Sequence, residues 1–145
     1  MTPQARPALD SDGPALADLS TQLGYPMTPG EARERLASIA GHPDHALLVA
    51  EEDGRVSGWI QVSLTRVFET PTQAEIAGLI VDEAARGRSI GAALLGEAEA
   101  WARARGCEAL RVRTNVVRER AHRFYRRAGF EPIKTQHVFE KRIES

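Results

Sequence analysis

A chain of 145 residues with 42% hydrophobic and 27% charged residues is long enough to form one domain with a substantial core. A net charge of −1 argues against a general nucleic-acid or membrane binder, and no apolar run reaches the length of a membrane span. A single cysteine, Cys107, excludes an internal disulfide framework, and the polar N-terminus has no apolar signal core. We therefore expect one cytoplasmic domain over residues 1–145.

The N-terminal third predicts two helices after a short strand. Residues 6–9 are typical of a strand, and the acidic and hydroxyl residues at 10–12 offer N-caps for a helix that Gly24 ends. Residues 28–31, Thr-Pro-Gly-Glu, form a capping box with proline at the first helical position. This pattern predicts a second helix that runs to about Ile39.

The middle of the chain predicts three strands and then a long helix. Residues 45–51 and 56–65 are expected to form strands, and Glu52-Asp53-Gly54-Arg55 is expected to join them in a hairpin. Residues 74–81 are the next predicted strand. Apolar side chains recur at helical spacing over 89–105, so we expect a helix there, ended near Gly106.

The C-terminal third predicts two more strands around one helix. Residues 109–114 alternate as in a strand, residues 118–128 show a helical apolar face closed by Gly129, and residues 138–143 suggest a final strand. This order mixes hairpins with strand–helix–strand crossovers. We therefore expect a mixed α/β fold whose sheet carries helices on both faces.

Charge is unevenly placed along the chain. Arginines crowd the segment from Arg103 to Arg127, whereas several acidic residues lie between Glu31 and Glu75. One interpretation is two solvated faces. The other is a basic side for an anionic cofactor and an acidic side for a cationic substrate.

A glycine-rich turn lies between the strand 74–81 and the helix that follows it. Its sequence is Arg86-Gly87-Arg88-Ser89-Ile90-Gly91. The first turn of a helix has unpaired backbone N–H groups and the positive end of the helix dipole, so such a turn can hold a phosphorylated ligand. Taken alone, the turn also fits a simple strand-to-helix connection.

A second motif follows, and the two together resemble a known family. It reads Asn115-x-x-Arg118-x-x-Ala121-x-x-Phe124-Tyr125-x-x-x-Gly129-Phe130. The chain resembles the GNAT superfamily of acyl-CoA-dependent N-acetyltransferases, whose cofactor motif is Arg/Gln-x-x-Gly-x-Gly/Ala and whose second signature is an asparagine followed by A-x-x-F/Y-Y-x-x-x-G-F. The resemblance covers residues 74–130. Ser89 departs from the usual glycine, and its hydroxyl could cap the helix or reach a phosphate oxygen.

The resemblance implies the GNAT fold and an acetyl-CoA site. The expected architecture is a central mixed, mostly antiparallel sheet of about six to seven strands with about four helices on both faces. The family's pantetheine arm lies where two parallel strands splay apart, and its pyrophosphate lies on the amides of the turn. The residues so implied in cofactor binding are Leu79, Ile80, Val81, Arg86, Gly87, Arg88, Ser89, Ile90, Gly91, Ala92, Asn115 and Tyr125.

Two residues are candidates for catalysis. By resemblance, the hydroxyl of Tyr125 would give its proton to the departing thiolate; the alternative is a tyrosine of the apolar core. Glu75 would take a proton from the amine, directly or through water; the alternative is a carboxylate that is solvated or only attracts a cation.

Cys107 is expected to pack rather than react, so the attack is direct. His42 and His45 lack further ligands at suitable spacing, so no metal site is expected.

The expected activity is therefore acetyl transfer from acetyl-CoA to a primary amine, with a small molecule as the leading acceptor. The runs around Glu75 and Tyr125 also look like those of aminoalkylphosphonate N-acetyltransferases, although these residues mainly serve the cofactor. Alternatives are a protein or peptide acetyltransferase and a non-catalytic acyl-CoA sensor. A nucleic-acid protein is disfavoured by the near-neutral charge. Homodimers are common in the family, so a homodimer is possible.

Overall fold

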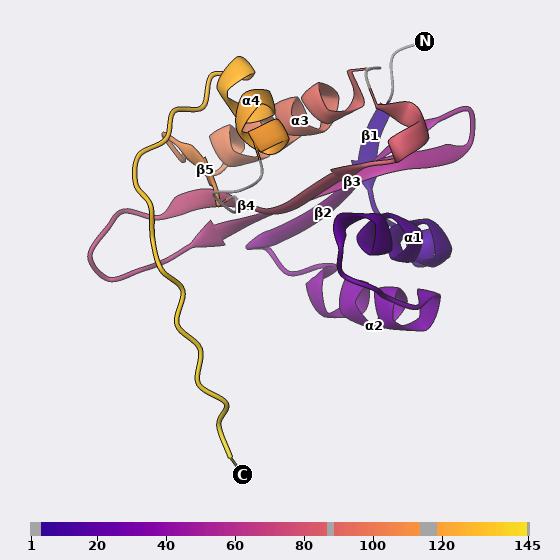
Figure 1. The fold of residues 1–145 in the computed structure, drawn as a ribbon, viewed down its shortest axis with the longest axis horizontal. Helices are drawn as coiled ribbons and strands as arrows, with labels where there is room; N and C mark the ends of the chain where they lie inside the picture. Colours follow the sequence, from indigo (N-terminus) through magenta and orange to yellow (C-terminus); the bar gives the residue numbers. More distant parts are fainter. Residues whose placement is uncertain (1–3, 87–88, 114–118, 145) are drawn as a thin grey trace. The chain divides into compact units, whose positions relative to one another are not determined.

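The computed structural model describes residues 4–86, 89–113 and 119–144 (Figure 1). The chain divides into two compact units, Met1–Arg113 and Thr114–Ser145, and each is described by itself. The first unit contains the sheet and three of the helices, and the second contains a helix and an extended C-terminal segment. The expectation of one domain over the whole chain stays a prediction.

A five-stranded sheet forms the centre of the first unit. The strands lie in chain order: β1 (Gln4–Pro7), β2 (His45–Glu52), β3 (Arg55–Thr65), β4 (Gln73–Val81) and β5 (Leu110–Val112). Neighbouring strands are antiparallel except β4 and β5, which are parallel. The predicted mixed, mostly antiparallel sheet is confirmed, but the prediction of six to seven strands is wrong for the described residues.

Helices cover both faces of this sheet. Helices α1 (Gly13–Leu23) and α2 (Pro29–Ile39) lie on one face and α3 (Ile90–Ala104) on the other, as Figure 1 shows. Two short 3-10 helices, η1 (Asp10–Asp12) and η2 (Glu83–Ala85), precede α1 and α3. On the α1–α2 face, buried apolar side chains of both helices pack with those of β2 and, partly buried, Trp59 of β3. The predicted helices on both faces are confirmed.

Local sequence explains where these elements begin and turn. The Thr28 hydroxyl accepts a hydrogen bond from the Glu31 amide at 3.1 Å, and the Glu31 carboxylate accepts one from the Thr28 amide at 2.9 Å, so the predicted capping box starts α2. Asp53 and Gly54 have φ of 53° and 76°, the left-handed pair that a two-residue hairpin needs. Both predicted features are confirmed.

A partly buried ion pair joins β1 to the start of α1. The guanidinium of Arg6 donates to both oxygens of Asp12, at 2.8 and 3.0 Å, and to Glu51 at 2.5 Å. The Asp12 carboxylate, 7% exposed, also accepts from the Leu9 amide at 2.7 Å. The hydrogen bonds from Arg6 hold the pKa of Asp12 below its usual value, although burial opposes this.

Helix α3 packs closely against β3 at Gly58. A Cβ at this position would lie 2.9 Å from the carbonyl oxygen of Ile80, 3.2 Å from Leu94 and 3.4 Å from Ile90. Ile90 and Leu94 are 1% and 0% exposed, so this contact belongs to the core between α3 and the sheet. The absence of a side chain at Gly58 therefore determines how near the first turns of α3 approach the sheet.

The second unit contains α4 (Glu119–Arg127) and the chain after it. Tyr125 makes edge-to-face contacts with Phe124 and Phe130, with ring centroids 5.2 and 5.4 Å apart. Gly129 has φ of 97°, and the Phe130 amide donates to the Tyr125 carbonyl at 2.9 Å. The predicted end of this helix is confirmed. Its predicted start, Arg118, lies outside the described residues.

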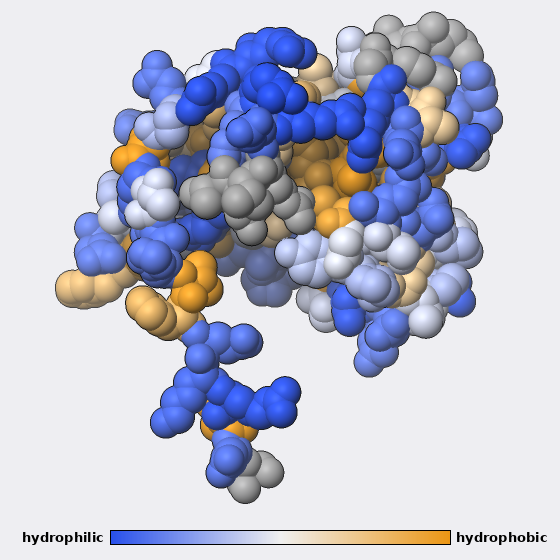
Figure 2. Space-filling view, in the orientation of Figure 1, coloured by the Kyte–Doolittle hydropathy of each residue, from blue (hydrophilic) through white to orange (hydrophobic). Residues whose placement is uncertain are grey.

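Residues 130–144 form no strand, so the prediction of a strand over 138–143 is wrong. Val138, Phe139 and Ile143 are 92%, 92% and 90% exposed. Figure 2 shows orange residues among blue ones along this extended segment. Alternating side chains favour a strand only where a neighbouring edge supplies hydrogen-bond partners, and no described strand pairs with this segment.

None of the described helices could span a bilayer.

Candidate active site

Among the described residues, the pairing of β4 with β5 ends at Ile76. The parallel pairing joins Ala74–Ile76 to Leu110–Val112, and then it stops. Strand β4 continues to Val81 while still paired with β3. Among the described residues no strand pairs with its other edge from 77 to 81, which is the edge at which an added strand or a ligand could pair. This segment includes Leu79, Ile80 and Val81, which the sequence predicted to contact pantetheine.

A β-bulge marks the start of this unpaired segment. Gln61 is opposite Gly78 and Val62 is opposite Ile76, so Ala77 has no partner of its own in β3. Directly opposed residues of neighbouring strands have their side chains on the same face of the sheet. Glu75 is opposite Ser63 of β3, and side chains at odd-numbered positions near Ser63 in β3 lie on the same face as Ser63. Trp59 belongs to the same face and packs with α1 and α2. Glu75 therefore lies on the face that carries these two helices.

The predicted phosphate turn leads into α3. Arg86 is exposed after η2, and Ser89 is the N-cap of α3 with φ of 64° and ψ of 17°. This left-handed conformation is the one that a glycine adopts without strain. The Ser89 side chain makes no capping hydrogen bond, so its predicted capping role is not seen. The first N–H groups of α3, at residues 90–92, have no acceptor within the helix and can bind an anion.

Both oxygens of the Glu75 carboxylate accept hydrogen bonds. The guanidinium of Arg113 donates to Oε1 at 2.5 Å, and the hydroxyl of Thr65 donates to Oε2 at 3.1 Å. The Glu75 side chain is 18% exposed, whereas that of Arg113 is 64% exposed. Sequence reasoning missed Arg113 and Thr65, because the register that brings them to Glu75 is not encoded locally.

The candidate acid, Tyr125, lies in α4. Burial raises the pKa of its hydroxyl to about 12. Glu75 and Tyr125 belong to different units of the chain and are described separately. Three further predicted residues, Gly87, Arg88 and Asn115, lie outside the described residues.

Comparison with known families agrees with this geometry. The family model described as "Acetyltransferase (GNAT) family" matches residues 15–130, most of the chain. The chain belongs to the GNAT acetyltransferase family. The predicted resemblance and the predicted enzyme class, an N-acetyltransferase among the acyltransferases, are thereby confirmed.

Two curated proteins are similar to this GNAT chain. One, an aminoalkylphosphonate N-acetyltransferase of Salmonella typhimurium, is 34% identical over 100 residues, which is 68% of this chain and 65% of the relative. The other, an aminoglycoside N(6′)-acetyltransferase type 1 of Klebsiella aerogenes, is 26% identical over 147 residues and 97% of both chains. The chain thus spans slightly under two thirds of the first relative and nearly all of the second.

Solved structures show the same fold. AAC(6′)-Iy, in complex with the bisubstrate analog CoA-S-monomethyl-acetylneamine, superposes with a TM-score of 0.86 over 99% of this chain and 100% of its own. The two sequences are 18% identical, so the likeness concerns the fold alone. This GNAT fold and the acetyl-CoA that the family uses are consistent with the unpaired edge of β4.

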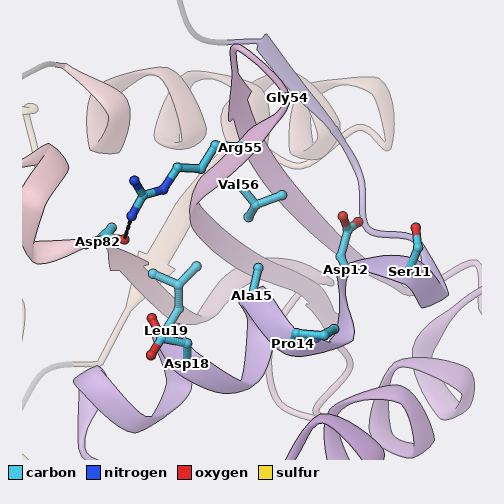
Figure 3. Close-up of a pocket in the computed structure, with 10 residues that line it drawn as sticks. All are labelled: Ser11, Asp12, Pro14, Ala15, Asp18, Leu19, Gly54, Arg55, Val56 and Asp82. Carbon is cyan, nitrogen blue, oxygen red and sulfur yellow. Dashed lines mark hydrogen bonds and ion pairs between the residues drawn. The ribbon is translucent and has the colours of Figure 1, made fainter.

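A concavity of about 420 Å³ lies in the first unit, between α1, the β2–β3 hairpin and Asp82 (Figure 3). Its carboxylates already have partners. Asp82 pairs with Arg55 at 3.3 Å and Asp12 pairs with Arg6, whereas Asp18 accepts a hydrogen bond from the next turn of α1. None of the predicted site residues lines it, so we assign it no part in the reaction.

The histidines considered as metal ligands interact with each other. The rings of His42 and His45 are 4.8 Å apart in an edge-to-face arrangement. Within the described part of the chain, no three side chains of the ligating types gather as a metal site would require.

Proposed function

We propose that this GNAT chain transfers the acetyl group of acetyl-CoA to the primary amine of a small molecule by direct attack on the thioester. The observation that carries the proposal is the edge of β4 over residues 77–81, with which no described strand pairs on the β5 side. This edge begins two residues after Glu75, and the chain then leads through η2 to the first turn of α3. The names of both curated relatives, which concern aminoalkylphosphonates and aminoglycosides, support a small acceptor.

The residues present fit acetyl-CoA. The backbone of Leu79, Ile80 and Val81 would pair with the pantetheine amides as an added strand would. The amides of 89–92 and the charge of Arg86 would hold the pyrophosphate, and we assign Gly87, Arg88 and Asn115 to the same site from the motif. Acetyl-CoA supplies the activated acetyl group and the thiol that leaves.

Glu75 is proposed as the base. An acceptor amine is mostly an ammonium at neutral pH and must lose a proton before it can attack a carbonyl. Glu75 takes this proton, directly or through water. The nitrogen loses a second proton once the C–N bond has formed, and the sulfur leaves with the electron pair of the C–S bond and gains one proton. One proton is therefore released to solvent in each turnover.

Tyr125 is proposed to donate to the departing sulfur. With its pKa raised by burial to about 12, the hydroxyl keeps its proton at neutral pH. A thiol has a pKa of about 8.5, so full transfer from Tyr125 to a thiolate is uphill by roughly 3–4 pKa units. Tyr125 therefore acts mainly by hydrogen bonding to the developing negative charge, which stabilises the transition state.

The test is release of CoA thiol with a panel of acceptors: aminoalkylphosphonates, polyamines, aminoglycosides, amino acids and short peptides. We expect release with one class of small amine. Glu75→Gln should lower kcat/KM by roughly 10²–10⁴-fold, which is the usual size of a base's contribution. Glu99→Gln, on the exposed side of α3, is the matched control and should have no effect.

Two results would contradict the proposal. One is acetyl-CoA binding without thiol release for any amine of the panel, which would favour a sensor. The other is peptide acetylation in preference to every small amine. Full activity of Glu75→Gln would contradict the role of Glu75 as base while leaving the overall reaction intact. Calorimetric titration with acetyl-CoA separates loss of cofactor binding from loss of turnover.

A further inference from the structure

The ion pair between Glu75 and Arg113 occupies the group that we propose as the base. Arg113 donates to Glu75 Oε1 at 2.5 Å, and Thr65 donates to Oε2 at 3.1 Å. A guanidinium keeps its proton at any physiological pH, so Arg113 cannot itself relay the proton of the amine. An acceptor ammonium must instead replace Arg113 beside Oε1. A simple cationic amine would be repelled by the guanidinium that it has to displace.

Arg113 is placed so that it can move. It follows β5 directly, and its side chain is 64% exposed, whereas Glu75 is 18% exposed and is also held by Thr65. Ion pairs with one well-exposed partner are held weakly, since water can replace either contact. Glu75 would therefore keep its position while Arg113 turns toward another anion.

A second arginine lies beside this pair. Arg111 of β5 is the register partner of Glu75 across the parallel ladder, so the two share a face of the sheet. Two arginines thus lie on the same face as one carboxylate, and among the described residues Arg111 forms no ion pair with an acidic side chain. Phosphonate, phosphate, sulfonate and carboxylate groups bind a guanidinium through two parallel hydrogen bonds.

We infer that Arg113 is a specificity residue that keeps Glu75 paired until an anionic group on the acceptor draws it away. The preferred acceptor is then a small amine that also carries an anion, separated from the nitrogen by a short carbon spacer. The anion takes Arg113, and the ammonium takes the vacated oxygen of Glu75. This inference rests on the proposed function, because it specifies the acceptor of the same site.

The experiment compares amines of similar length that differ at the far end. Aminoethylphosphonate, taurine and β-alanine carry different anions; propylamine is neutral there, and diaminopropane is cationic. For the wild-type chain we expect kcat/KM at least about 10-fold higher with the anion-bearing amines than with propylamine, and lowest with diaminopropane. The order among the three anions identifies the preferred one.

Variants of Arg113 locate the effect. Arg113→Gln should raise KM for the preferred anionic amine by about 10-fold or more, leave propylamine unchanged or faster, and remove the preference between them. Arg113→Lys keeps the charge without the paired donors and should restore part of the preference. Arg66→Gln is the matched control, because Arg66 is similarly exposed and forms an ion pair with Asp44. Melting temperatures confirm that each variant is folded.

Two outcomes would overturn the inference while the proposed function stands. One is equal kcat/KM for propylamine and the anionic amines. The other is an equal loss with all acceptors in Arg113→Gln, which would mean a structural role. Thiol release with no amine would instead contradict the proposed function. Calorimetric titration of aminoethylphosphonate into wild type and Arg113→Gln then tests anion binding independently of turnover, and equal affinities would contradict the inference.

Discussion

Replacing Gly58 by alanine tests how α3 is held against the sheet. The added Cβ would lie 2.9 Å from the Ile80 carbonyl oxygen, a backbone atom that cannot move without disturbing the β3–β4 ladder. It would also lie 3.2 Å from Leu94 and 3.4 Å from Ile90, which are fully buried. Overpacking of this kind lowers the free energy of unfolding by about 1–3 kcal/mol. For a chain of this length, that corresponds to a melting temperature lower by roughly 2–12 °C.

The assay is urea unfolding followed by tryptophan fluorescence. Both tryptophans, Trp59 and Trp101, belong to the unit that contains Gly58, so their emission reports on that unit. Gly96→Ala is the control, because nothing lies within 4 Å of a Cβ at this exposed helical position. The control should gain about 0.5–1 kcal/mol of stability. Because Gly58→Ala also displaces the first turns of α3, its Kd for acetyl-CoA should rise.

The result that would refute this reasoning is a Gly58→Ala variant with the wild-type urea midpoint and an unchanged m-value. Such a result would mean that α3 and β4 adjust at no cost. A loss of equal size in Gly96→Ala would also contradict it, because alanine would then be unfavourable on α3 for a reason other than contact with the sheet.

Four further changes test other parts of the structure. Asp12→Asn should lower the free energy of unfolding by about 1–3 kcal/mol at neutral pH. Because the pKa of Asp12 is depressed in the folded state, the wild type should lose this extra stability as pH falls below about 4. Thermal unfolding curves of the two proteins that still differ in acid would contradict the role of Arg6. Tyr125→Phe should lower kcat with little change in the Kd for acetyl-CoA. Because burial raises the pKa of Tyr125 to about 12, the wild type should lose stability between about pH 10 and 12, and the variant should lack that loss. Ser89→Gly removes a serine in the left-handed conformation, which costs about 1–2 kcal/mol, but it raises the entropy of the unfolded chain by an amount worth about 0.5–1 kcal/mol. Calorimetry should therefore find equal or slightly higher stability. A clear loss of stability would show that the serine hydroxyl matters. Cys107→Ser should keep full turnover in the thiol-release assay, and an inactive but folded variant would reopen a covalent route.

The parts of the fold that local sequence could predict are those that local bonds stabilise. The capping box at Thr28–Glu31 and the hairpin turn at Asp53-Gly54 each require only neighbouring residues, and both are as expected. The helix at 90–104 is similarly encoded by its own apolar spacing. Strand number was harder to predict, because a strand over 138–143 needs a partner edge that the segment cannot specify itself.

The candidate site likewise has parts that local sequence predicts and parts that only the structure reveals. The position of Glu75 on β4 and of Ser89 at the start of α3 follows from motifs in the chain, although their roles stay predictions. The contact of Glu75 with Arg113 depends on how β4 and β5 are aligned, and this alignment is a property of the whole sheet. No motif in the sequence marks Arg113, so only the structure identifies it.

The bulge at Ala77 determines which face of the sheet Glu75 occupies. Ala77 is exposed and unpaired in the β3 ladder, so many side chains would be tolerated there. If Ala77 instead paired with Val62 in a regular ladder, the first half of the strand would be rotated by half a turn. Glu75 would then face the packed interior beneath α3, and Ile76 would face the opposite side. The extra residue puts the side-chain alternation before Ala77 out of phase with the alternation after it. A single strand can thus contribute side chains to both an apolar core and a polar site.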